Sequence, residues 1–84
     1  MDKDLEKYYE NQFSMMATEG WKELIEDMKS LEANLVNVRT VADAQTLNYR
    51  LGQLDILDLI LKRKDTCEQV YEQLSNESEE LKNA

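Results

Sequence analysis

Residues 47–61, LNYRLGQLDILDLIL, decide the fold because their leucines recur at helical spacing. Five leucines, at positions 47, 51, 54, 57 and 61, follow steps of four, three, three and four residues, so they share one helix face. No proline occurs in the chain to stop this helix in either direction. We therefore predict a long helix over residues 41–76, with a kink near residues 62–66 as the alternative.

Two shorter helices are predicted upstream, over residues 3–17 and 21–36. Gly20 lies between them, and a glycine costs about 1 kcal/mol relative to alanine in a helix interior, which predicts a break there. Thr40 is expected to cap the long helix, since its hydroxyl oxygen can accept from free backbone N–H groups of the first turn. Asp43 would then favour the positive end of the helix dipole.

The predicted fold is all-α and forms a single domain over residues 1–84. Folding the chain about Arg39 and Thr40 pairs the second and third helices as an antiparallel hairpin. The apolar residues of the second helix recur at alternating steps of four and three, which is typical of coiled-coil packing. The N-terminal helix, or another subunit, is expected to cover the end of the long helix.

The composition excludes most catalytic and metal-binding chemistry. The chain has no histidine, which is the commonest general base and the commonest metal ligand. Carboxylate metal sites in helix bundles also need a Glu-x-x-His element. Cys67 is the single cysteine, lies on an apolar helix face and is interpreted as a small buried hydrophobe. We predict no enzyme activity, no catalytic residue, no cofactor and no metal.

Acidic residues outnumber basic ones by 18 to 10, giving a net charge of −8 that disfavours direct binding to nucleic acid. Residues 37–64 carry a net +2 between two flanking blocks of −5 each. This pattern is typical of solvated helix surface, although it could also set the register between stacked copies. Two charged groups are singled out: an acidic face of Glu19, Glu23 and Asp27, and a basic cluster of Lys62, Arg63 and Lys64.

The basic cluster is interpreted as a solvated junction or an ion-pair site between subunits. Lys62 is also expected to pair with Asp58 one helical turn away.

The stretch from Leu54 to Leu61 is apolar on nearly every side, whereas one hairpin partner covers one stripe. Ile56 and Leu59 therefore need a second partner, either the N-terminal helix or another protein chain. The predicted partner interface combines large apolar residues of this stretch with others from all three predicted helices. Its residues are Phe13, Met16, Trp21, Leu54, Ile56, Leu59, Ile60 and Tyr71.

Neither a secretory signal nor an apolar run long enough to span a bilayer is recognisable, so no membrane contact is expected. A free cysteine fits a reducing cytoplasm.

Two short motifs carry a resemblance to known proteins. The chain enters its second helix as FSMMATEGW, residues 13–21, and continues through YRLGQL, residues 49–54, to a hydrophobic run and an acidic tail. Over residues 13–74 it resembles small helical proteins encoded by short-tailed bacteriophages. The resemblance implies a phage origin and a role in virion structure or assembly, in the host cytoplasm or within the virion. It supplies no catalytic residues.

The function expected is therefore that of a non-enzymatic structural protein, which would bind its own copies or a larger structural protein through helix–helix contacts. The alternative is a small acidic phage inhibitor of a host enzyme that handles nucleic acid. Its acidic face would mimic phosphate.

Overall fold

We describe residues 1–83 in a computed structural model, with the side chains of residues 1–37 and 39–81. The helices are α1 (Lys3–Met16), α2 (Glu19–Leu35), α3 (Ala44–Leu61) and α4 (Arg63–Asn83), and a short 3₁₀ helix, η1 (Val38–Thr40), lies between α2 and α3. No strand occurs within residues 1–83. The predicted all-α class is confirmed.

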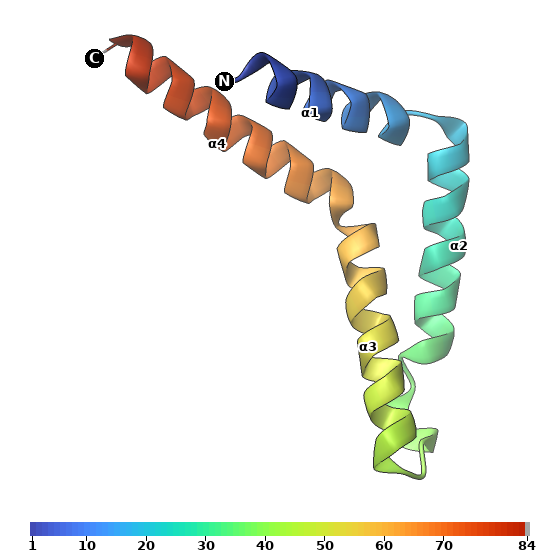
Figure 1. The fold of residues 1–84 in the computed structure, drawn as a ribbon. Coiled ribbons are helices and arrows are strands. Elements are labelled where there is room, and N and C mark those ends of the chain that lie inside the picture. Colours follow the sequence, from blue (N-terminus) through green and yellow to red (C-terminus); the bar gives the residue numbers. More distant parts are fainter. Residues whose placement is uncertain (84) are drawn as a thin grey trace.

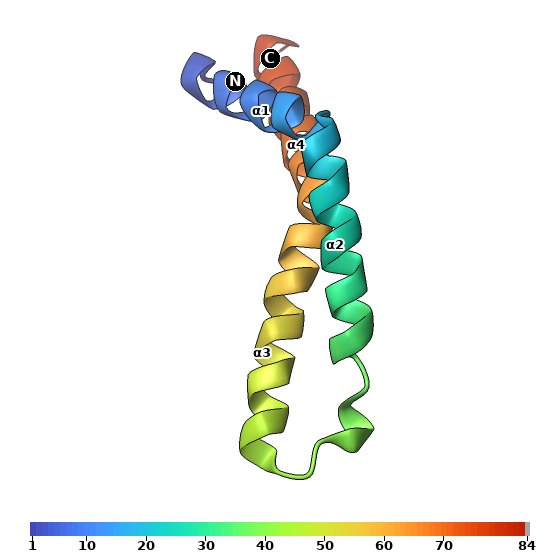
Figure 2. The ribbon, with the colours of Figure 1, turned by 90° about the vertical axis from the view of Figure 1, so that its right-hand side faces the viewer.

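The helices form two antiparallel pairs that meet at a bend (Figures 1 and 2). α2 packs against α3, and α1 packs against α4, with the two chain ends at the far end of the α1–α4 pair. The molecule measures 58 × 30 × 16 Å, so it is long and thin. Both helix pairs therefore expose most of their surface.

The first bend is set by Thr18. Its Oγ1 accepts a hydrogen bond from the backbone N–H of Trp21 at 3.2 Å and donates to the carbonyl of Met15 at 2.7 Å. α1 thus ends at Met16 and α2 begins at Glu19. The break falls before Gly20, which lies in the first turn of α2, because threonine satisfies N–H groups that glycine cannot reach.

The start of α3 differs from the sequence prediction, which placed the cap at Thr40. Thr40 lies in η1, and the cap is Asp43. One carboxylate oxygen of Asp43 accepts from the backbone N–H of Thr46 at 2.8 Å, and the other accepts from its hydroxyl at 2.9 Å. Aspartate outranks threonine at this position, and the side chain of Thr46 supplies the second bond.

The helix predicted over residues 41–76 is two helices in the structure. Lys62 separates them, at one end of the region where the kink was expected, and α4 continues past residue 76 to Asn83. Lys62 still donates its backbone N–H to the carbonyl of Asp58 at 3.0 Å, so the chain bends with little loss of backbone hydrogen bonding.

Three side chains are buried among those described, namely Met16, Leu57 and Cys67, and of these Cys67 is fully buried. Met16 ends α1, Leu57 points from α3 to α2, and Cys67 lies near the start of α4. These buried residues lie on three different helices, so no continuous core fills the described part of the molecule.

Candidate functional site

An apolar face runs along one side of the α2–α3 pair. It contains two open hollows, of about 530 Å³ and about 340 Å³. Successive steps of three or four residues place their α3 residues on one side of that helix. We call this surface the groove face and define it by Trp21, Leu24, Leu31, Leu35, Tyr49, Gly52, Ile56, Leu59 and Ile60.

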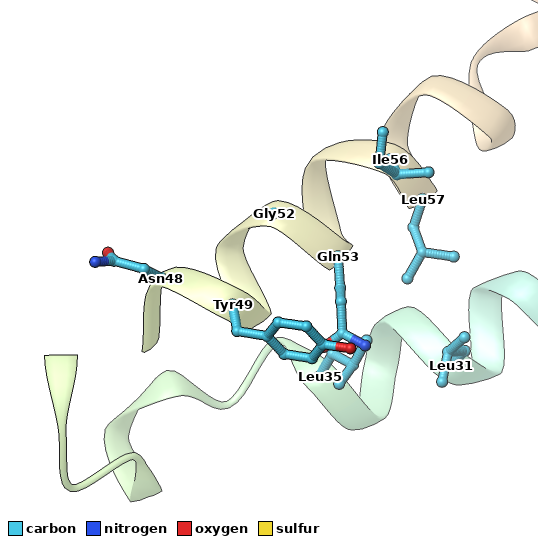
Figure 3. Close-up of a pocket in the computed structure, with 8 residues that line it drawn as sticks. All are labelled: Leu31, Leu35, Asn48, Tyr49, Gly52, Gln53, Ile56 and Leu57. Atoms are coloured by element: carbon cyan, nitrogen blue, oxygen red, sulfur yellow. The ribbon is translucent and has the colours of Figure 1, made fainter. Parts of the chain in front are cut away.

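The larger hollow is lined by uncharged residues: Leu31, Leu35, Asn48, Tyr49, Gly52, Gln53, Ile56 and Leu57. Leu57 points toward α2, whereas Ile56 points away from it (Figure 3). Tyr49 is 70% exposed, Ile56 57% and Leu59 67%. Three large apolar residues on one side of a single helix form the kind of contiguous patch that marks an interaction site.

Gly52 lies between Tyr49 and Ile56 on the groove face. A Cβ added to Gly52 would meet no atom within 4 Å, so the chain itself makes no close approach there. The structure thus shows open space at this glycine. A glycine in a helix interior costs about 1 kcal/mol, and nothing within the chain offsets that cost.

The predicted interface residues lie in three places. Phe13 and Tyr71 hold α1 against α4: the Tyr71 ring lies 5.6 Å from that of Phe13 and 6.1 Å from that of Tyr9, both in edge-on contact. Met16 is buried at the end of α1 and lines a hollow with Lys64 of α4. Leu54 is half-buried on α3. The other four residues, Trp21, Ile56, Leu59 and Ile60, belong to the groove face.

Trp21 lies where the two helix pairs meet. It lines the smaller groove-face hollow with Leu59 and Arg63, and a further hollow with Met16 and Lys64. Its indole thus borders residues on both sides of the α3–α4 break.

The acidic face lies fully exposed on α2. Glu19 forms an ion pair with Lys22, with 3.2 Å between Nζ and Oε1, and both side chains remain largely in water. Glu23 and Asp27 are also exposed. Exposed pairs of this kind contribute about 0–1 kcal/mol, so the acidic face contributes little to the stability of the fold.

The basic cluster does not act as one unit. Lys62 pairs with Asp58, with 3.0 Å between Nζ and the carboxylate, which confirms the ion pair predicted from their spacing. Arg63 donates from a guanidinium nitrogen to the hydroxyl oxygen of Tyr8 at 2.6 Å, linking α4 to α1. Lys64 faces the hollow beside Met16.

Comparison with protein-family models, with curated proteins and with solved structures finds no match to this chain.

Residues that could host chemistry are dispersed. Within the described chain, no group of three or more histidine, cysteine, aspartate or glutamate side chains comes together to hold a metal ion. Nor do the described helices include one that is long and apolar enough to cross a bilayer. Cys67 is 1% exposed.

The predicted interface omitted five groove-face residues: Leu24, Leu31, Leu35, Tyr49 and Gly52. The apolar residues of α2 had been assigned to the coiled-coil pattern of the hairpin. A usable signal existed: Tyr49, Gly52, Ile56 and Leu59 form a second stripe on α3 at steps of three, four and three. The leucine stripe on the same helix gives the stronger periodic signal, so this second stripe was not recognised.

Proposed function

We propose that this protein is a non-enzymatic assembly component that acts through helix–helix contacts made by its groove face. The observation that carries this proposal is the exposure of Tyr49, Ile56 and Leu59 along one side of α3. Burying one such side chain fully is worth about 1.5–3 kcal/mol, so a partner helix seated here gains a substantial hydrophobic contribution.

The shape of the groove face suits a helical partner. Both α2 and α3 contribute lining residues to each hollow, so an apolar helix can place its side chains between these two helices as in helix bundles. Large apolar anchors within a depression are where binding energy concentrates in protein interfaces.

The resemblance over residues 13–74 supports a bacteriophage setting. In that setting the protein is a virion component, or a head or tail assembly factor, that binds its own copies, a larger structural protein, or both. It acts in the host cytoplasm and is incorporated into the virion when it remains bound.

The test is affinity purification from cells infected with the encoding phage, followed by mass spectrometry. Wild type is compared with Leu59→Lys on the groove face and with Leu81→Lys, a matched change at an exposed leucine of α4. We expect wild type and Leu81→Lys to retain the same virion proteins and Leu59→Lys to lose them. Equal retention by all three would contradict a role for the groove face, and the absence of virion proteins would contradict the assembly role.

The acidic face supports a second candidate, an inhibitor that mimics phosphate toward a host enzyme handling nucleic acid. Its three carboxylates are all exposed on α2. Reversing the charge of Glu19, Glu23 and Asp27 together would abolish such inhibition in an assay of the host enzyme. Inhibition unchanged by the triple substitution would remove this candidate.

A further inference from the structure

The surface area of the chain exceeds what its mass requires. The accessible surface is 6702 Å² for a chain of 9.9 kDa. A compact monomer of this mass exposes about 5,200 Å², so about 1,500 Å² remains that a compact fold would have buried. The elongated shape and the exposed groove face account for this excess.

We propose that a second copy of this chain covers the groove face, with the α3 helices antiparallel and crossing at Gly52. The inference rests on the proposed function, because it names a partner for the same surface. If each copy buries its excess, the pair removes about 3,000 Å² from water, within the range of obligate homodimers, about 2,000–5,000 Å². The result is a four-helix arrangement of two α2–α3 pairs.

The positions of the exposed residues fit a two-fold axis. Tyr49 and Ile56 lie equally far along α3 from a point between Gly52 and Gln53. An antiparallel copy therefore sets Tyr49 of one chain against Ile56 of the other, twice, as an isologous interface requires. Gly52 has no side chain and faces open space, so the two helices can approach closely at the axis.

The charges allow this arrangement. Each copy carries a net −8, but the residues lining the larger hollow are all uncharged. The centre of the interface thus contains no like-charge contact, and exposed charges separated by more than about 8 Å are largely screened at physiological salt. A second copy is also complementary in shape, because each copy has the exposed side chains of Tyr49 and Ile56 and the larger hollow into which the other copy's side chains can fit.

Disulfide cross-linking tests the register. In the double variant Tyr49→Cys/Ile56→Cys, oxidation should join each position 49 to position 56 of the other copy and yield a covalent dimer. The matched single variants should stay uncross-linked, because identical positions lie about 10 Å apart along the helices, beyond disulfide reach. Native Cys67 is buried and stays reduced. Cross-linking by a single variant, or none by the double variant, would overturn the register.

Sedimentation equilibrium tests the dimer itself. Wild type should show twice the chain mass of 9.9 kDa. Gly52→Leu should be monomeric yet retain its helical circular dichroism, since a Cβ at this position meets no atom within 4 Å and leucine is a good helix former. Ala33→Leu, at an exposed α2 position outside the groove face, should remain dimeric. A monomeric wild type, or a dimeric Gly52→Leu, overturns the inference. A monomer that still retains virion proteins leaves the proposed assembly role standing.

Discussion

The aromatic contact between α1 and α4 gives the sharpest stability prediction. Phe13 and Tyr71 meet edge-on with ring centroids 5.6 Å apart and planes at 83°. Such pairs are worth about 0.5–1.5 kcal/mol beyond the area they bury. A double-mutant cycle with Phe13→Leu and Tyr71→Leu should therefore give a coupling energy of about 1 kcal/mol, because leucine keeps apolar bulk but loses the ring.

The assay is urea unfolding followed by the fluorescence of Trp21, the single tryptophan, which lies at the bend between the helix pairs. All four proteins are measured at one protein concentration, since association shifts apparent stability. In a chain this short, 1 kcal/mol corresponds to about 4–8 °C in the thermal midpoint. Single effects that add fully in the double variant would refute a direct contact between the two rings.

Three further predictions concern a bend, a cap and a buried thiol. Thr18→Ala should destabilise the protein by about 1 kcal/mol and Thr18→Ser far less, measured by thermal melting. The pKa of Asp43 is lowered because the backbone N–H and the hydroxyl of Thr46 donate to its carboxylate. Its contribution to stability is therefore complete above the ordinary value of 3.8 and is lost as the pH falls through the lowered pKa. A melting series in acid should show this loss in wild type and not in Asp43→Ala. Cys67 should react with a maleimide at the rate of unfolding, and rapid labelling of native protein would contradict its burial.

The helical class could be predicted because apolar spacing is strong throughout the chain. The residue at which α3 begins was harder to predict from the sequence, because Thr40 and Asp43 are both suitable N-cap residues and lie close together. The choice depends on Thr46, whose hydroxyl gives Asp43 a second hydrogen bond. Capping preferences rank residue types but do not include such side-chain partners.

The candidate site was only partly predictable, because α3 is apolar on nearly every side. Period alone cannot decide which of several apolar stripes faces the neighbouring helix. The structure turns Leu57 inward and leaves Tyr49 outside. No glycine or proline lies near Lys62 in the sequence to indicate the break between α3 and α4. It accompanies contacts distant in sequence, including the hydrogen bond from Arg63 to Tyr8.

Trp21 is a side chain that the α1–α4 pair and the α2–α3 pair share at the bend. It lines one hollow with Leu59, at the end of the groove face, and another with Met16 and Lys64, where α1 ends and α4 begins. A change in the angle between the two helix pairs would alter the packing around the Trp21 ring. It would thereby move part of the lining of the groove-face hollow beside Leu59. Force applied near the chain termini would therefore act on the groove face through this ring as well as through the backbone that runs from α3 into α4.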